Sequence, residues 1–389
     1  GLLTHCARDR FGVKPLNYYK EGDRTISISS EASALSDIFD LPLSKKSLQE
    51  YNVFRAPIFQ GSFYKNVECV KPGTCIIKGK FFDSLDYVTD DYDNIENTIE
   101  NLDIAIKKSI DSRMISDVPV GLLYSGGIDS NLINHYSSVE LNRFTGGFPG
   151  DYDMEFAKNS TAKSNIIKVN RDEFIDRFNS MIEIRKEPLS VPNEIILSFL
   201  AGAWSKTGGK VLLSGEAADE LFGGYDRIYS WAVSNEEFNV ETFLSLYAYE
   251  ELSKIDEEII NDVRSFFNTL ENISVFEKVR QFFIKIHLPI LFRRLDFALM
   301  YSGVEGREPL ASSMIFEVAM KANPKNLFKN DLGKFPLRYL ISKKINKEFA
   351  FKPKVGFPID LGDIFNGIKT KNRHENYNIW QKENLRRVI

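Results

Sequence analysis

Residues 120–130 read Val-Gly-Leu-Leu-Tyr-Ser-Gly-Gly-Ile-Asp-Ser, a compact apolar run followed by a glycine-rich turn. Apolar residues resume at Leu132-Ile133, which predicts a buried strand that passes through the turn into a helix. Glycines let backbone N–H groups converge, the hydroxyls of Ser125 and Ser130 add donors, and a helix N-terminus adds positive charge. The pattern therefore predicts an anion-binding turn. The simpler alternative is a glycine turn in which Asp129 and Ser130 cap a helix.

Residues 214–225 read Ser-Gly-Glu-Ala-Ala-Asp-Glu-Leu-Phe-Gly-Gly-Tyr and follow a second apolar run at 211–213. The carboxylates of Glu216, Asp219 and Glu220 would repel one another in one cleft, so the cluster predicts a cation site or a general base. An acidic helix N-terminus is the alternative, but it leaves the flanking glycines unexplained. Asp129 would likewise repel a bound phosphate unless Mg²⁺ bridged the two groups.

Composition excludes several classes of protein. The 389 residues are 43% hydrophobic and 27% charged, which allows one large domain and a smaller one. The net charge of -4 supplies no basic field for nucleic acid or an anionic membrane, and no apolar run approaches the roughly 20 residues of a bilayer span. Cys6, Cys69 and Cys75 lack metal-site spacing, so we expect reduced thiols in a cytoplasmic protein.

The chain divides into a first part of short strands and a second part in which strands and helices alternate. Residues 1–90 indicate strands and turns, including a hairpin at Thr74–Ile77 and Lys80–Phe82, and the acidic stretch Asp86–Asn97 is expected to be a linker. Later strands are expected at Val118–Tyr124, Phe144–Phe148, Ile166–Val169 and Lys210–Leu213. The fold class is therefore α/β, with a doubly wound parallel sheet over 91–389 that binds ligands at the carboxyl ends of its strands.

Beyond about residue 230 the chain is expected to be almost wholly helical and is rich in phenylalanine. These phenylalanines could form the protein's own core, which is the preferred interpretation, or bury a homodimer interface.

The motifs together resemble a known family. Residues 125–130 resemble the pyrophosphate-binding loop of the N-type ATP pyrophosphatases, whose fold is of the adenine nucleotide alpha-hydrolase type. Residues 214–225 match the asparagine synthetase motif at every position except Ala217, where the family has glycine. Glu187-Pro188 and the stretches 303–310 and 351–357 continue the resemblance in the family's order.

The first 90 residues resemble the closing part of the family's class II glutamine amidotransferase domain, an α+β fold with an N-terminal nucleophile. The resemblance rests on residues 8–16, Arg-Asp-Arg-Phe-Gly-Val-Lys-Pro-Leu, and on Ser29-Ser30-Glu31. That domain uses a cysteine at its mature N-terminus. Because Cys6 is internal and lies on a predicted strand, we expect no glutaminase site within these residues.

The resemblance implies residue roles. The implied ATP-binding residues are Tyr124, Ser125, Gly126, Gly127, Asp129, Ser130, Gly146, Ser214, Gly215 and Tyr225. Asp129 and Asp219 would ligate Mg²⁺ on the ATP phosphates. The implied catalytic residues are Glu216 near the reacting carboxylate or ammonia, Lys354 at the α-phosphate, and Arg307.

The implied reaction is amide formation in two steps, adenylation of a carboxylate by ATP and attack by ammonia, which is supplied free or from glutamine. Aspartate is the default acceptor. The acceptor half departs from the family, however: residues 308–312 read Glu-Pro-Leu-Ala-Ser in place of Val-Pro-Phe-Leu-Asp, Phe297 replaces a basic residue, and Asp151–Val169 is short and lacks a histidine. These departures keep open a different acceptor, such as a surface-polysaccharide sugar or a small metabolite.

Two other functions are less consistent with the sequence than this reaction is. A nucleobase-thiolating enzyme would need reactive cysteines and a basic RNA-binding face, and the composition favours neither. A nucleotide-binding paralogue without turnover would not need Asp129, Asp219, Glu216 and Lys354 together.

Overall fold

The computed structural model describes residues 5–22, 24–77, 80–82, 91–151, 163–352 and 359–389. In the first part of the chain it contains two three-stranded antiparallel sheets. One has the order β1 (His5–Ala7), β5 (Cys75–Ile77), β6 (Lys80–Phe82), and the other has the order β3 (Arg24–Ser29), β2 (Asn17–Glu21), β4 (Val67–Cys69). The predicted hairpin is confirmed, since Cys75 pairs with Phe82.

Helices α1 (Ala32–Phe39) and α2 (Lys45–Phe54) lie between β3 and β4; the pattern of strands and turns had not marked them, but they agree with the α+β fold that the resemblance implies. The α2 helix begins at Ser44, whose side chain accepts a hydrogen bond from the backbone N–H of Ser47. It buries Tyr51 and Phe54, which are spaced three residues apart as a helix face requires.

The expected parallel sheet is confirmed. Its order is β11 (Glu305–Arg307), β10 (Val211–Leu213), β7 (Val120–Leu123), β8 (Asn142–Gly147), β9 (Asn165–Lys168), and every neighbouring pair is parallel. From β7 the chain proceeds outward to β8 and β9, and then crosses to β10 and β11 on the other side.

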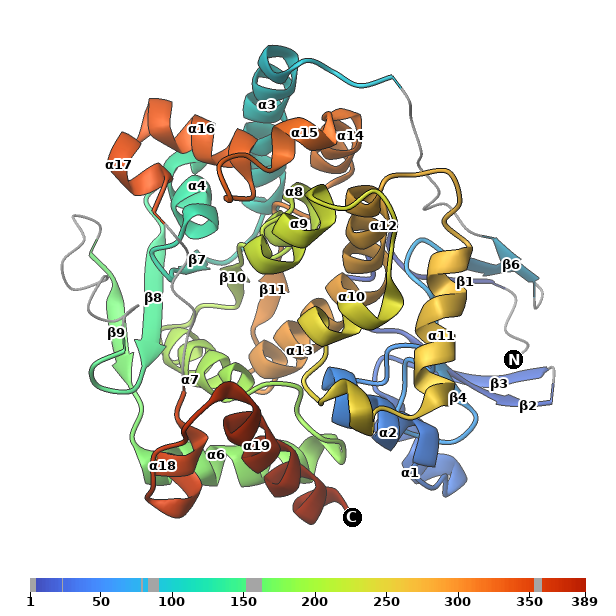
Figure 1. Ribbon diagram of the computed structural model, residues 1–389. Helices are drawn as coiled ribbons and strands as arrows, with labels where there is room; N and C mark the ends of the chain where they lie inside the picture. The colour runs from blue at the N-terminus through green and yellow to red at the C-terminus, as the bar shows by residue number, and fades with distance from the viewer. Residues whose placement is uncertain (1–4, 23, 78–79, 83–90, 152–162, 353–358) are drawn as a thin grey trace.

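Helices cover both faces of this sheet (Figure 1). Helices α3 (Ile95–Arg113) and α4 (Ile128–Tyr136) lie on one face, and α7 (Asn193–Lys206) and α13 (Leu288–Met300) on the other. Side chains alternate along the strands accordingly: Leu213 shares a buried cluster with Ile106 of α3, whereas Leu212 shares another with Trp204 of α7.

Beyond about residue 230 the described chain is almost wholly helical, which confirms the expectation, and β11 is the one strand named there. That strand has only three residues and a central glycine, too little for a periodic pattern. The other helices are α6 (Arg171–Arg185), α8 (Ala218–Phe222), α9 (Asp226–Val233), α10 (Val240–Tyr247), η1 (Leu252–Lys254), α11 (Glu257–Asn268), α12 (Val275–Phe282), η2 (Phe283–His287), α14 (Ser313–Lys321), α15 (Pro324–Leu327), α16 (Phe335–Lys344), α17 (Lys347–Ala350), α18 (Leu361–Asn366) and α19 (Arg373–Val388).

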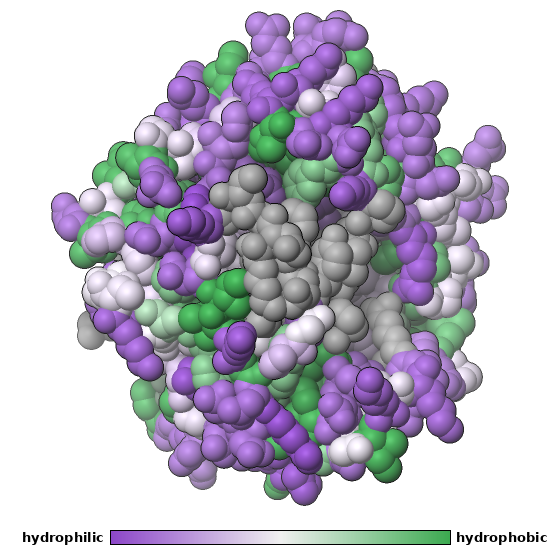
Figure 2. Space-filling view, turned by 90° about the vertical axis from the view of Figure 1, so that its left-hand side faces the viewer, coloured by the Kyte–Doolittle hydropathy of each residue, from purple (hydrophilic) through white to green (hydrophobic). Residues whose placement is uncertain are grey.

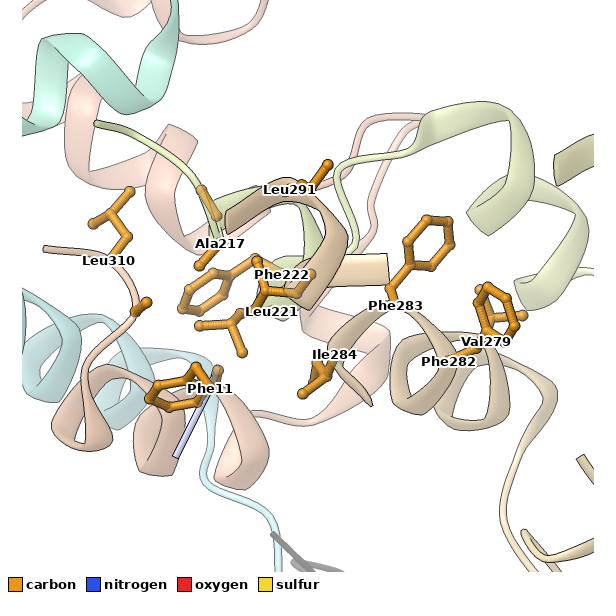
Figure 3. Packing of buried hydrophobic residues seen from close by; sticks show 14 of the residues in the cluster. Phe11, Ala217, Leu221, Phe222, Val279, Phe282, Phe283, Ile284, Leu291 and Leu310 are labelled. Carbon is orange, nitrogen blue, oxygen red and sulfur yellow. The ribbon is translucent and has the colours of Figure 1, made fainter. Parts of the chain in front are cut away.

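The phenylalanine-rich region forms the protein's own core. Phe222 of α8 and Phe283 of η2 are buried together with Leu291 of α13 (Figure 3). Phe11, from the first part of the chain, belongs to the same cluster and contacts the ring of Phe316 at a centroid separation of 5.5 Å. The first part of the chain and the parallel sheet therefore share one hydrophobic core.

The expected linker is partly structured where it is described. Residues 83–90 lie outside the described chain, but Asp93 already pairs with Ala322, and Asn94 caps α3 by accepting a hydrogen bond from Asn97 N at 2.8 Å. The end of the predicted linker was therefore placed too late.

The surface on the side of β8 and β9 is mainly hydrophilic where it is described, with small separate hydrophobic patches (Figure 2). A search of the described helices finds none that is long and apolar enough to cross a membrane.

Candidate active site

The two glycine-rich segments follow adjacent parallel strands. Strands β7 and β10 pair with Val120 opposite Val211 and Leu122 opposite Leu213. The chain leaves β7 toward β8 on one side, whereas β10 leads to β11 on the other. Ligands of open α/β sheets bind where strand order reverses in this way, outside the carboxyl ends of the strands.

The turn after β7 is held by its own hydroxyls. Gly126 has a φ of 75°, which glycine adopts without strain. The Ser125 Oγ accepts a hydrogen bond from Gly127 N at 3.2 Å, and Ser130 Oγ donates to Gly127 O at 3.2 Å. Gly127 is the N-cap of α4 and offers no capping side chain. Such a helix N-terminus, with backbone N–H groups and a positive dipole end, suits an anion.

Asn131 fixes this turn and was missed at the level of sequence. Its Nδ2 donates to Gly126 O at 2.8 Å and to Gly127 O at 3.0 Å, and its Oδ1 accepts from the Tyr124 hydroxyl at 2.9 Å. The sequence feature that could have revealed this role is the amide side chain of Asn131 itself, which directly follows the motif and lies in the first turn of the helix.

Tyr124 and Gly146, two predicted nucleotide contacts, have structural roles as well. The Tyr124 side chain is buried, and its backbone N donates to Phe144 O at 2.8 Å. A Cβ atom at Gly146 would lie 2.6 Å from Leu200 Cδ2 and 3.0 Å from Ile167 O, so glycine is required by packing against α7 and β9. Their contact with a nucleotide stays a prediction.

The second segment approaches the first at Gly215. A Cβ atom there would lie 2.7 Å from Cβ of Asp129, so the close approach of the two segments depends on glycine. Ser214 extends the strand ladder, since its backbone N donates to Arg307 O at 2.9 Å, and its hydroxyl accepts from Glu216 N at 3.4 Å.

Ala217 has a φ of 83°, in the left-handed region that favours glycine. The family motif has glycine at this position, and the structure supplies the reason. Alanine there is strained, and its side chain is fully buried.

Asp129 and Asp219 converge on a cation that was not a predicted site residue, Lys334. Its Nζ lies 3.0 Å from Oδ1 and 2.7 Å from Oδ2 of Asp129, and 2.8 Å from Oδ1 of Asp219. Only 4% of the Lys334 side chain is exposed. Lys334 immediately precedes α16, and its backbone N donates to Phe222 O at 2.9 Å, which anchors it beside α8.

The two carboxylates have the chemistry for the predicted Mg²⁺. Carboxylate oxygens are ligands that Mg²⁺ prefers, usually together with substrate phosphates and water. No group of three or more His, Cys, Asp or Glu side chains suited to a metal occurs among the described residues. Asp129 and Asp219 would therefore hold Mg²⁺ only with oxygens from phosphate or water.

Behind Asp219 lies a buried acid that sequence reasoning named only as part of the cluster. Burial, reinforced by Asp219 and Glu216, raises the pKa of Glu220 well above its usual range. The Tyr225 hydroxyl donates to Glu220, and the Tyr225 ring stacks on Phe283 at 4.3 Å. Tyr225 thus holds α8 in place, and its role toward ATP stays a prediction.

Of the two predicted catalytic residues that the structure describes, Glu216 lies in this cluster and Arg307 does not. The Arg307 guanidinium bonds to Glu305 and to the backbone oxygens of Arg113 and Ile115, at 2.8–3.2 Å. None of these partners belongs to the two glycine-rich segments. Lys354 lies outside the described residues.

A second basic group, Arg294 of α13, adjoins Glu216. Burial disfavours its charge, but Glu216 and Glu194 outweigh that effect and raise the pKa of Arg294. No described residue forms a hydrogen bond or ion pair with its guanidinium. The basic residue that the resemblance led us to expect after Asp296 is a buried phenylalanine, Phe297.

Comparison with known proteins agrees with this arrangement. The asparagine synthase family model matches residues 101–387, which is well over half of the chain. The chain belongs to the asparagine synthase family. A glutamine amidotransferase domain model matches residues 3–86.

Relatives in the asparagine synthase family are distant and longer than this chain. Asparagine synthetase [glutamine-hydrolyzing] 1 of Bacillus subtilis is 26% identical over 92% of this chain and 66% of its own length. Asparagine synthetase B [glutamine-hydrolyzing] of Escherichia coli is 24% identical over 70% of this chain and 47% of its own length. The chain thus spans about two thirds of the first relative and half of the second.

Proposed function

We propose that this chain activates a substrate carboxylate with ATP and converts it into an amide with ammonia. The observation that carries the proposal is the convergence of Asp129 and Asp219, from two separate strand ends, within 3.0 Å of one atom, Lys334 Nζ. Convergent carboxylates and a buried cation beside an anion-binding turn suit the triphosphate of a metal-bound nucleotide.

In the first step a carboxylate oxygen attacks the α-phosphorus of ATP, the bond to the bridging oxygen breaks, and pyrophosphate leaves. The turn at Ser125–Ser130 and Lys334 would bind the phosphates, and Asp129 and Asp219 would hold Mg²⁺. Bound Mg²⁺ would supply neutralisation of the charge that develops on pyrophosphate. Lys354, by resemblance, would act at the α-phosphate.

Arg294 is the residue that we propose for acceptor binding. It is the basic group beside Glu216 that has no ion-pair partner in the described chain, and a carboxylate is the natural partner of a guanidinium. The names of the relatives favour aspartate. The replacement of the family's usual basic residue by Phe297 favours a second candidate, a different carboxylate on a sugar or small metabolite.

In the second step ammonia attacks the acyl carbon, AMP leaves with the electron pair of the broken bond, and a proton is lost. The glutamine amidotransferase match at residues 3–86 favours glutamine as the source, with free ammonia as the alternative. Glu216 would lie beside the acyl group. A cytoplasmic location, and a homodimer as one assembly, remain expectations.

The test is release of pyrophosphate from Mg·ATP in the presence of ammonium chloride and aspartate, or of other carboxylates in turn. Asp129→Asn should abolish release, whereas Asp103→Asn, which removes a carboxylate paired with Lys344 on α16, should not. Release only with another acid would reassign the acceptor. ATP binding with no pyrophosphate from any acid would contradict the proposal and leave a nucleotide-binding paralogue.

A further inference from the structure

Glu308 is a buried acidic residue, of which only 5% is exposed. Within the described part of the chain, its side chain forms no hydrogen bond and no ion pair. It directly follows β11, whose Arg307 is opposite Leu213 of β10. Glu308 therefore lies at the same carboxyl edge of the sheet as Ser214 and the residues that follow it.

The carboxyl folds back over the strand toward the first part of the chain. A Cβ atom at Gly306 would lie 3.1 Å from Glu308 Oε1 and 3.1 Å from Leu299 Cδ1 of α13, so glycine makes the space that the carboxyl fills. On the same strand, Lys14 Nζ donates to Gly306 O at 3.2 Å and to Asp296 Oδ1 at 2.7 Å. The carboxyl thus lies where the loop containing Lys14 meets α13 and β11.

The charges around Glu308 favour a small cation. The carboxylates that act on it are Asp296 of α13, Glu216 after β10, and Asp9 of the first part, and the cations are Lys14 and Arg113 of α3. Lys14 is paired with Asp296, and Arg113 donates to Ser112 and to Ala311 O. Acidic groups therefore outnumber basic ones beside a carboxyl that has no donor of its own.

We propose that Glu308 binds the ammonium ion and takes a proton from it, so that ammonia reaches the activated acyl group. This inference rests on the proposed function and extends it to the nitrogen substrate. Lys14 and Asp9, which act on Glu308, belong to the residues that match a glutamine amidotransferase domain, and Glu216 of the second glycine-rich segment also acts on it. Ammonia arriving from that domain would meet Glu308 before the acyl group.

The proton balance is simple. Ammonium transfers one proton to the Glu308 carboxylate and becomes ammonia, whose lone pair forms the C–N bond as the bond to AMP breaks and AMP leaves with its electron pair. The new amide nitrogen loses a second proton to solvent, and Glu308 releases the first one to solvent as well. Burial, with the charges of Asp296 and Glu216, raises the pKa of Glu308 to about 8. This pKa is much nearer to the pKa of ammonium than the pKa of an ordinary carboxyl group is. Transfer between groups of similar pKa is efficient near neutral pH.

An acceptor-binding role is less consistent with the surroundings. An acceptor carboxylate held against Glu308 would be repelled by Asp296 and Asp9, and the charged groups that act most strongly on Glu308 include none of Asp129, Asp219 and Lys334. A cation as small as ammonium needs little room and is attracted electrostatically by each of these carboxylates.

The experiment compares two nitrogen nucleophiles at pH 7.5 with an acid that supports pyrophosphate release. Ammonia is mostly protonated at this pH and needs a base, whereas hydroxylamine is mostly neutral and does not. Glu308→Gln should keep the pyrophosphate burst and the rate with hydroxylamine, and should lower kcat/KM for ammonium chloride roughly 100-fold. The wild-type pH profile with ammonium should show a group titrating near pH 8 that the variant lacks.

Glu50→Gln is the matched control, because Glu50 of α2 is another buried carboxyl whose pKa burial raises, and the charged groups that act on it are Lys46 and Asp262 instead of those around Glu308. It should leave both nucleophiles unchanged. Glu308→Val installs the residue that the family motif has, and it replaces Glu308→Gln if that variant folds poorly. Equal effects on both nucleophiles, or on neither, would overturn the inference and leave adenylation intact. Absence of a burst in the wild type with every acid would instead refute the proposed function.

Discussion

The Nζ atom of Lys334 lies 2.7 Å from Oδ2 of Asp129, and 4% and 19% of the two side chains are exposed. The same ammonium reaches Asp219 at 2.8 Å. One cation thus holds together two carboxylates that would otherwise repel each other at low exposure. The contribution of this ion-pair cluster to the free energy of unfolding can therefore be measured without any substrate.

Lys334→Met should destabilise the protein by about 3 kcal/mol, because it leaves two largely buried carboxylates without their cation. Millimolar Mg²⁺ should recover part of that loss in the variant and less in the wild type. Urea unfolding with and without Mg²⁺ measures both effects. Lys344→Met is the control: its pair with Asp103 at 2.8 Å is about one third exposed, so it should cost less than about 1 kcal/mol. Equal losses in the two variants would contradict a special role for Lys334.

Ala217→Gly should stabilise the protein by about 1 kcal/mol, because it relieves a left-handed backbone that alanine adopts with strain. Ala218→Gly, one residue later at the start of α8, should instead destabilise it by about 0.5–1 kcal/mol. Both alanines are fully buried, so the pair isolates the backbone effect. Thermal unfolding gives the sign of the stability change for each variant. A change of the same sign in both would show that side-chain packing outweighs the backbone strain at Ala217.

Glu50→Gln should remove a pH-dependent loss of stability. Burial raises the folded-state pKa of Glu50 from 4.5 to about 7, so the folded state holds a proton that the unfolded state releases near pH 4.5. Stability contributed by this proton is present below pH 4.5 and is lost as pH rises to about 7. The variant should therefore be more stable than wild type by about 2–3 kcal/mol at pH 8, and this gain should shrink toward pH 4.5.

The measurement is chemical unfolding of both proteins across this range. Glu258→Gln, which changes an exposed carboxylate that also contacts Lys46, should show almost no pH-dependent difference. A constant difference between Glu50→Gln and wild type at all pH values would contradict the assignment.

Asn131→Ala should raise KM for ATP roughly tenfold while changing kcat less. It removes three hydrogen bonds that fix the turn at Gly126 and Gly127, each contributing about 1 kcal/mol or less when partly exposed. The control is Asn134→Ala, on the same helix as Asn131, which removes a hydrogen bond from Arg143 of β8. A larger fall in kcat than rise in KM would indicate that Asn131 acts on the reaction itself.

The sequence predicted the parallel sheet because its buried strands are short apolar runs that end in glycine turns. That Asp129 and Asp219 would lie close together followed from the family resemblance, which implies that both ligate Mg²⁺. Lys334 could not be found this way, because it lies far along the chain from both acids and no local pattern marks it. Helix α2 was overlooked because its apolar residues are mixed with polar ones.

Glu308 shows a different limit. The sequence shows Glu308 only as a departure from a family motif, and that departure does not indicate which role the residue has. Its burial and its position over Gly306 depend on α13 and on the loop containing Lys14, which tertiary structure alone brings to β11.

The placement of Phe11 restricts how this protein can be divided in the laboratory. Its ring is buried with Leu221 and with the other apolar side chains around α8 (Figure 3), and Val53 and Phe54 of α2 belong to the same cluster. Expressing residues 1–90 apart from the remainder would expose, on both fragments, the apolar surfaces that pack against each other in the intact chain. We therefore expect the two pieces to aggregate when made singly and to regain solubility when produced together.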